Sequence, residues 1–500
     1  MQRPDEHPAR ATQRLAVIAV AALTVVALLL RFSTLGRSLW LDEAWRANIA
    51  LAPSWPAFWS DVLGSGGGKI GAPMPPIFVV VLRAIGLVTG HSAVGMRLLP
   101  LAASIAAVPI AYVVGRRAAG TAAGLVAALC LTAAPAALLH GQELKQYSVD
   151  VTVVLTLLLA TSAVAASPST WRAWLVLAGV QSLAPGLAYP AALVLPGTAL
   201  ATLSVCRGND DRKKWLVAQT ISALAALAWY ALVIGPQRER PRVLAYWAGD
   251  FPPLDQTLGP AWFAGQLRDF VVYACGQPAW LAAAVTVVGL VCAARWLGLA
   301  ALGTLATALA AAAWRIYPLS AGRATVFLLP FVYLGLAAAC GRMRTAIGAV
   351  LALLVAVTVI PLVGRGLVHP AAALVYEETE PLIAAIERER RPNDRVYVYD
   401  GAVPAFRFRH PAADPAIVLG SSRRTDNAAY ATEIRPLVVP GTRVWVLFAH
   451  VFVAPSGQSE RDVILGELAL YGRQVDAREA PGASLHLFEI TRAPGTVKHL

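Results

Sequence analysis

Two adjacent carboxylates, Asp42 and Glu43, lie between Trp40 and Trp45, directly after the first long apolar stretch of the chain, residues 15–30. Tryptophan is enriched where a bilayer meets water, so this placement puts both acids at a membrane surface. Ionised groups there are costly unless they are solvated, paired or used in a reaction. A carboxylate in such a place could remove a proton from a hydroxyl, and the pair is therefore the first candidate site.

A second polar stretch, residues 140–147, has the sequence HGQELKQY and separates two apolar stretches. Glu143, Lys145 and Tyr147 supply an acid, a cation and a hydroxyl, and Asp150 follows about one helical turn later. One interpretation is local, with Glu143 capping a helix and pairing with Lys145 in water. The other is that both acidic stretches face the same side of the membrane and form two walls of one site.

Other residues are suited to contact with an anionic or sugar-bearing ligand. Arg315 and Arg323 flank a short polar stretch between two apolar ones, and the planar guanidinium matches phosphate geometry. Interfacial snorkelling of the same side chains is the alternative. Tyr246 and Trp247 lie in a longer polar stretch, where they would suit a lipid headgroup or a sugar, although a solvated loop has a similar composition.

The composition indicates the class of protein to which these residues belong. Of the 500 residues, 57% are hydrophobic and 14% are charged, which is typical of a polytopic helical membrane protein. The formal net charge is +13, but much of the basic charge lies in short loops between apolar stretches. Such charge is expected to set membrane orientation, so we predict membrane lipids as partners and no nucleic acid. The cysteines and histidines lack the spacing of a metal site.

The apolar stretches predict about eleven transmembrane helices, each roughly 20 residues long. Residues 77–88 are too short to span and contain Arg83, so we place them in the outer interface, which leaves the later basic clusters in the cytoplasm. Residues 122–139 are predicted as one outward span. The result is a multi-pass protein of the cytoplasmic (inner) membrane with a cytoplasmic N-terminus and outer loops at residues 31–97, 140–148, 235–278 and 314–324.

From residue 364 the composition changes to that of a soluble domain. Apolar periodicity predicts helices over residues 377–390 and 460–471 and strands over 395–399, 443–449 and 485–490. We therefore expect a transmembrane domain over residues 1–363 and an extracytoplasmic α/β domain over residues 364–500.

Together these features resemble the GT-C glycosyltransferases, and most closely their protein O-mannosyltransferase and aminoarabinose transferase branch. Residues 143–147, ELKQY, look like the second-loop pattern of that branch, which has Glu, a basic residue and Tyr, with Lys145 where Arg is frequent. Pro75 and Pro76 resemble its interfacial Pro-Pro segment, but Met74 stands where the mannosyltransferases have His. This departure argues against a protein mannosyltransferase specifically.

The resemblance implies a GT-C fold and the inverting transfer of a sugar from a polyprenyl-phosphate donor to a hydroxyl of a glycan, lipid or protein acceptor. It implies that Asp42 is the base, that Glu43 orients the acceptor or shares this role, and that Glu143 completes the acidic wall. The expected phosphate-binding residues are Lys145, Arg315 and Arg323, and the expected substrate contacts are Tyr147, Tyr246 and Trp247. No cofactor is expected; a divalent cation between Asp42 and Glu143 is conceivable, but metal independence is favoured.

Two other classes of function fit parts of the pattern. A transporter or flippase of a lipid-linked sugar is the main alternative, and a membrane scaffold with an outer binding domain is the third. Transporters typically have inverted repeats and polar groups near the membrane midplane. Here the acids lie in loops, and the sequence has no convincing repeat, so an enzyme is the favoured hypothesis.

Overall fold

The computed structural model describes residues 6–63, 73–238, 246–253, 259–342, 346–372, 374–424 and 426–493. The chain forms two compact units. The helical unit consists of residues 1–35, 54–85 and 97–374, and the α/β unit consists of residues 36–53, 86–96 and 375–500. The acidic pair Asp42 and Glu43 thus belongs to the α/β unit, whereas the second polar stretch belongs to the helical unit.

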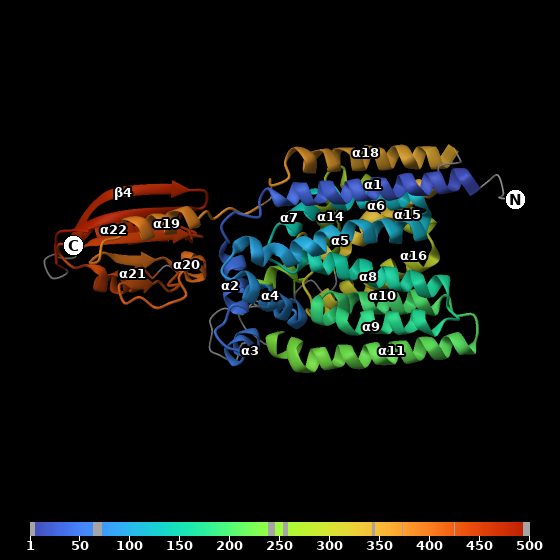
Figure 1. Ribbon diagram of the computed structural model, residues 1–500, viewed down its shortest axis with the longest axis horizontal. Coiled ribbons are helices and arrows are strands. Elements are labelled where there is room, and N and C mark those ends of the chain that lie inside the picture. Colours follow the sequence, from blue (N-terminus) through green and yellow to red (C-terminus); the bar gives the residue numbers. More distant parts are fainter. Residues whose placement is uncertain are drawn as a thin grey trace. The chain divides into compact units, whose positions relative to one another are not determined.

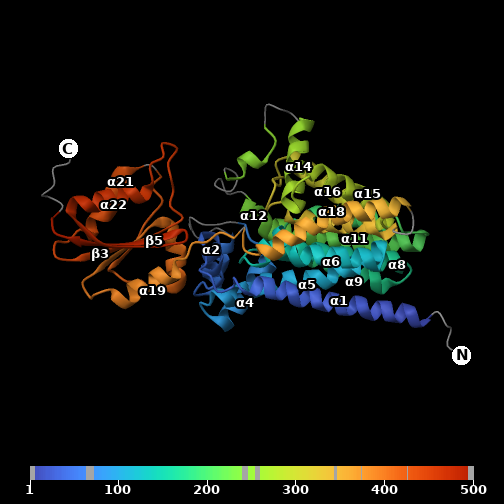
Figure 2. The ribbon, with the colours of Figure 1, turned by 90° about the horizontal axis from the view of Figure 1, so that it is seen from above.

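In the helical unit, long helices such as α1, α5, α8 and α11 run alongside one another (Figures 1 and 2). The helices are α1 (Glu6–Phe32), α3 (Trp55–Leu63), α4 (Pro76–Thr89), α5 (Ala93–Ala119), α6 (Thr121–Ala133), α7 (Pro135–Gly141), α8 (Tyr147–Ala166), α9 (Trp171–Leu187), α10 (Ala191–Leu203), α11 (Asn209–Trp229), α12 (Gly235–Arg238), α14 (Pro260–Cys275), α15 (Ala279–Cys292), α16 (Arg295–Ala313), α17 (Leu329–Ala338) and α18 (Ala346–Val368).

Within the described residues, six helices are long and apolar enough to cross a membrane: α1, α5, α8, α11 with its continuation to Gln237, α16 and α18. Two bent helix pairs, α6 with α7 and α14 with α15, raise the number to eight if each pair is one span. The chain is therefore a polytopic helical membrane protein. The predicted number of eleven spans is not reached by this measure, because several apolar helices that correspond to predicted spans, such as α10 and α17, have only 13 and 10 residues.

The predicted span over residues 122–139 is not one straight helix, although the two helices that form it are together long and apolar enough to be one span. Helix α6 ends at Ala133, α7 begins at Pro135, and the two are bent by 57°. Proline has no backbone N–H and pushes the residue before it into an extended conformation, which Ala134 adopts with ψ 134°. The break leads the chain directly into the second polar stretch.

The predicted outer loop at residues 235–278 contains a helix that the sequence pattern does not predict. Its second half forms helix α14, which begins with Pro260 at its first turn and is followed by Gly276 at φ 79°. Helix α14 meets α15 at 90°. By contrast, α4 is a short apolar helix, as expected, and the Arg83 guanidinium packs over the rings of Trp55 and Phe58 of α3 at 4.7 and 5.1 Å.

The α/β unit contains α2 (Leu41–Ala50) and a five-stranded sheet in the order β2-β1-β3-β5-β4. Strands β2, β1 and β3 are parallel, and β5 and β4 are antiparallel to their neighbours. Its other elements are α19 (Glu380–Glu389), β1 (Arg395–Val398), α20 (Val403–Arg409), β2 (Ile417–Leu419), α21 (Asn427–Ile434), β3 (Arg443–Ala449), α22 (Glu460–Tyr471), β4 (Gly472–Ala480) and β5 (Ala483–Ile490).

Alternating side chains of β1 and of Tyr399, the residue that follows it, contribute to two cores, one on each face of the sheet. Val396 and Val398 face a core that includes residues of α19 and α20. Tyr397 and Tyr399 face the opposite core, which includes residues of α21 and α22. This period of two is what an interior strand covered on both faces requires, and it explains why the predicted strands at residues 395–399 and 443–449 lie where β1 and β3 are found.

Candidate active site

The acidic pair occupies the first turn of α2, and its two carboxylates have different surroundings. Glu43 is fully buried; each of its oxygens lies 3.4 Å from an Arg37 nitrogen, and it accepts the Trp40 N–H at 3.3 Å. This is the arrangement in which an acid at the third helical position reaches back to cap its own helix. Asp42 is only partly buried. The geometry gives Glu43 a structural role and leaves Asp42 as the stronger candidate for contact with substrate.

The second polar stretch forms a buried cluster at the bend between α7 and α8. The carboxylate of Glu143 lies 3.5 Å from His140 Nδ1, and His140 Nε2 lies 2.5 Å from the hydroxyl of Tyr273 on α14. The rings of His140 and Tyr147 meet edge to face at a centroid distance of 4.9 Å. An acid, an imidazole and two phenols are thus gathered where the chain leaves an apolar helix, an arrangement that can move or hold a proton.

Lys145 of this stretch and Asp150, which follows it on α8, are also buried, with exposed fractions of 1% and 3%. Burying ionisable side chains among membrane helices is costly, so residues of this kind commonly have a role in function. The local interpretation, in which Glu143 and Lys145 pair in water, does not hold, because neither residue is solvated.

A buried arginine fixes the break between α6 and α7, which leads the chain into this cluster. Arg31, at the end of α1, is 0% exposed, and its guanidinium donates to the carbonyl oxygens of Leu131, Thr132 and Ala137 at 2.8 to 3.2 Å. It also donates to Ser104 Oγ at 2.8 Å. The carbonyls around a proline break lack their usual helical partners, and the five N–H donors of arginine are suited to replacing them.

The two other arginines lie on the stretch between α16 and α17 and stack on aromatic rings of the long loop. The Arg323 guanidinium lies 5.1 Å from the Tyr246 ring and 5.3 Å from the Trp247 ring. Arg315 lies 5.0 Å from the Phe251 ring and donates to the Pro252 carbonyl at 3.0 Å. The structure therefore brings Arg323 together with Tyr246 and Trp247, and cation–π contacts of this kind attract a guanidinium to the face of an aromatic ring.

Tyr317 connects this stretch to the second polar stretch. Loss of solvation, with smaller contributions from the charges of Asp150 and Tyr147, raises the pKa of the Tyr317 hydroxyl well above its usual range. Val326 and Leu329, which follow the arginine-bearing stretch, also line a small cavity together with Ser148 and Val151 of α8. The arginine-bearing stretch therefore leads to the start of α8. Within the helical unit, Glu143, Tyr147, Arg315 and Arg323 belong to neighbouring segments.

The predicted pairing of Asp42 with Glu143 joins residues of different units and stays a prediction, as do the assigned roles of all the site residues. Among the described residues, no group of three or more His, Cys, Asp or Glu side chains could hold a metal ion. Sequence reasoning missed Tyr273 as a member of the Glu143 cluster, because it lies on a helix in a segment predicted as loop. His140 was identified only as part of its polar stretch.

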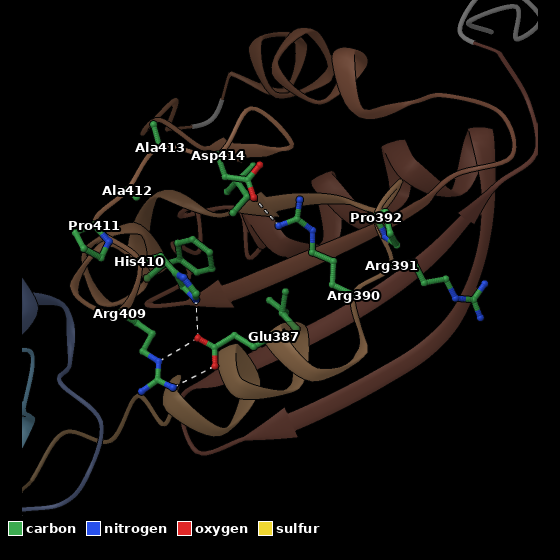
Figure 3. Close-up of a pocket in the computed structure, with 13 residues that line it drawn as sticks. Glu387, Arg390, Arg391, Pro392, Arg409, His410, Pro411, Ala412, Ala413 and Asp414 are labelled. Atoms are coloured by element: carbon green, nitrogen blue, oxygen red, sulfur yellow. Dashed lines mark hydrogen bonds and ion pairs between the residues drawn. The ribbon is translucent and has the colours of Figure 1, made fainter.

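A cavity of about 650 Å³ in the α/β unit contains none of the predicted site residues (Figure 3). Glu387 lies between Arg409 and His410, with contacts of 3.0 and 2.9 Å, and Arg390 pairs with Asp414 at 2.7 Å. These charged groups of the lining already pair with one another, which makes the cavity a weaker candidate for chemistry than the clusters above.

The sequence of the chain is similar to one family of membrane enzymes over part of its length. A family model described as dolichyl-phosphate-mannose-protein mannosyltransferase matches residues 73–234, a segment that includes the second polar stretch but not Asp42. No curated protein matches the chain.

Three solved structures share the fold. ArnT from Cupriavidus metallidurans, bound to undecaprenyl phosphate, has a TM-score of 0.55 at 13% identity, and the match covers 94% of this chain and 97% of that chain. The arabinofuranosyltransferase AftD from Mycobacteria has a TM-score of 0.53 at 15% identity over 94% of this chain and 40% of that chain. The oligosaccharyltransferase AglB from Archaeoglobus fulgidus, in complex with an inhibitory peptide and a dolichol-phosphate, has a TM-score of 0.50 at 11% identity. The match covers 97% of this chain and 75% of that chain. The chain thus has the fold of the GT-C membrane glycosyltransferases and resembles their aminoarabinose transferase and protein mannosyltransferase branch.

Proposed function

We propose that the chain is an inverting glycosyltransferase that moves a sugar from a polyprenyl-phosphate donor to an acceptor hydroxyl. The observation that carries the proposal is the group of buried residues Glu143, His140 and Lys145, with the partly buried Tyr273 bound to His140, in a chain with this fold. The undecaprenyl phosphate in ArnT and the dolichol-phosphate in AglB support a donor of the same chemical kind. In this proposal the reaction takes place at the outer face of the cytoplasmic membrane, and the α/β unit is extracytoplasmic.

In the proposed reaction the acceptor oxygen forms a bond to the anomeric carbon while the bond from that carbon to the phosphate oxygen breaks. Asp42 accepts the proton of the acceptor hydroxyl, as a single displacement with inversion requires. Glu143, held by His140, lines the acceptor side. Glu43 acts through Arg37 to position the first turn of α2.

The leaving lipid phosphate gains negative charge as the bond breaks, and fixed cations stabilise that charge most strongly in a site of low polarity. Lys145 is buried, so its positive charge would interact strongly with the phosphate. Arg315 and Arg323, on the stretch between α16 and α17, are further candidates for binding the phosphate. Tyr147, Tyr246 and Trp247 would contact the sugar or the lipid headgroup. The proposed reaction uses no metal ion.

The test is transfer of a radiolabelled sugar from an undecaprenyl-phosphate carrier by the purified full-length protein, with cell envelopes of a deletion strain as the acceptor source. We expect Asp42→Asn to reduce transfer by about 10²- to 10⁴-fold, the usual contribution of a general base, and Glu143→Gln to reduce it severely. Binding of undecaprenyl phosphate and the unfolding temperature should be retained in both.

Two exposed acids serve as controls. Asp462 lies in the first turn of α22, as Asp42 does in α2, and its side chain is 67% exposed. Asp269 on α14 is 47% exposed. Asp462→Asn and Asp269→Asn should transfer sugar at the unmodified rate. Unchanged transfer in both Asp42→Asn and Glu143→Gln would exclude the proposed site.

A further inference from the structure

Helix α2, which carries Asp42, is held at its N-terminus by a carboxylate that lies more than 300 residues away in the sequence. Glu377 Oε2 accepts the backbone N–H of Leu41, the first residue of α2, at 2.9 Å. The next residue, Glu378, accepts the Ser38 hydroxyl and N–H at 3.0 and 3.3 Å. Carboxylates at a helix N-terminus satisfy free N–H groups and interact favourably with the helix dipole.

The second oxygen of Glu377 binds a histidine. Glu377 Oε1 lies 2.7 Å from His450 Nδ1, and the Glu377 side chain is only 6% exposed. His450 follows the last residue of β3 and has φ +48°, a left-handed conformation that is uncommon for a residue with a side chain. Backbone strain of this kind persists where the surrounding structure requires one particular orientation.

We propose that Glu377 and His450 are positioning residues for the reaction, with Glu377 fixing the first turn of α2 and His450 orienting the Glu377 carboxylate and placing a positive charge beside that turn. This proposal rests on the proposed function, because it gives Asp42 the role of base. It gives the α/β unit a direct part in the reaction, because the sheet that ends in His450 sets the orientation of the first turn of α2 and the charge beside it.

The charges around His450 agree with this role. The hydrogen bond to Glu377 raises the pKa of His450, burial opposes this, and the charge of Asp42 raises it further, while Arg424 lowers it. The net shift is upward. An attraction between two charges acts on both, so a protonated His450 favours ionised Asp42 in turn.

The positive charge of His450 depends on pH. Because the pKa of His450 is raised in the folded protein, its stabilising charge is fully present below the ordinary histidine pKa and is lost as the pH rises through the raised value. At low pH, where Asp42 must stay ionised to act as a base, His450 is charged and assists. Removal of that charge should therefore shift the acid limb of the profile of kcat/KM toward higher pH.

The experiment measures sugar transfer from the undecaprenyl-phosphate donor by the full-length protein across the acid limb. We expect His450→Gln to move the acid limb to higher pH, because a positive charge near Asp42 is lost. Glu377→Gln should move it to lower pH, because a negative charge beside the first turn of α2 is lost while His450 stays protonated on the acid limb. The plateau kcat should stay within about threefold in both variants, since neither residue is the base. His450→Lys, which restores a cation, should move the limb back toward that of the unmodified protein. His410→Gln is the control, because His410 also pairs with a glutamate, Glu387 at 2.9 Å.

A second readout does not depend on activity. Hydrogen exchange in peptides covering α2 should be faster in Glu377→Gln than in the unmodified protein, because the Leu41 amide loses its charged partner. An unmoved acid limb in both variants, or a rate that falls equally at every pH, would overturn the proposal even if Asp42→Asn abolishes transfer. If Asp42→Asn has no effect but α2 exchanges faster, the proposed function fails, whereas the capping role of Glu377 stands.

Discussion

Asp42 and Glu43 are neighbours in the sequence but differ in what their carboxylates contact. Glu43 lies against Arg37 and the Trp40 amide and is shielded from solvent, whereas Asp42 is partly exposed. The sequence predicts that the two side chains diverge, because adjacent residues on a helix point in different directions. It could not predict which acid is buried, because that depends on Arg37 and on Glu377, which is 336 residues away from Leu41.

The burial of Glu43 leads to a prediction about stability. Glu43→Gln should lower the free energy of unfolding of the α/β unit by about 1 to 3 kcal/mol, because the buried Arg37 loses the negative charge it faces. Thermal unfolding of the detergent-purified protein measures the effect, with Asp462→Asn as the control. The double variant Arg37→Gln/Glu43→Gln should lose less stability than the sum of the single variants. Loss of transfer in Glu43→Gln without loss of stability would instead make Glu43 part of the chemistry.

At the scale of elements, the most consequential feature is the break between α6 and α7. The sequence does not reveal it, because apolar residues continue through Pro135 and proline is tolerated in membrane helices. Helix α14 was missed for the opposite reason, since Arg268 and Asp269 interrupt its apolar pattern. The α/β unit was more predictable: the predicted helix at residues 460–471 has the same bounds as α22, because the buried face of a soluble helix is visible in the period of its apolar residues.

Helix α18 packs directly against the break, which leads to a second stability prediction. A Cβ added to Gly366 would lie 1.6 Å from the Ala133 carbonyl oxygen, whereas one added to Gly364 would meet nothing within 4 Å. Gly366→Ala should therefore reduce stability by about 1 to 3 kcal/mol and reduce transfer, because the backbone that leads to Glu143 must shift. Gly364→Ala, on the same helix, should change stability by no more than about 0.5 kcal/mol. Equal unfolding temperatures for the two variants in detergent would contradict this packing.

At the scale of the whole molecule, the division into units differs from a simple order of membrane part followed by soluble part. Residues 36–53, which include α2, form one compact unit with residues 375–500. The composition shows where soluble character begins, but it cannot show that a segment near the N-terminus joins the C-terminal sheet. The hydrogen bonds from Leu41 and Ser38 to Glu377 and Glu378 provide the physical reason.

The proposed membrane orientation is testable with single cysteines in a cysteine-free background. Gln458→Cys lies in an exposed turn of the α/β unit, and Arg207→Cys lies at an exposed position between α10 and α11. A membrane-impermeant maleimide should label Gln458→Cys in intact cells and should label Arg207→Cys only after permeabilisation, as the positive-inside rule requires. Labelling of both sites from the same side would refute the proposed arrangement of spans.

The contacts of Arg31 also constrain the order in which the protein can assemble during synthesis. Its carbonyl partners Leu131 and Ala137 follow it by 100 and 106 residues, so α1 enters the membrane before these acceptors exist. Until then the guanidinium must remain at the lipid headgroups or in water, because a charge without partners is costly inside the bilayer. The first helix therefore reaches its final place only after α6 and α7 have been made.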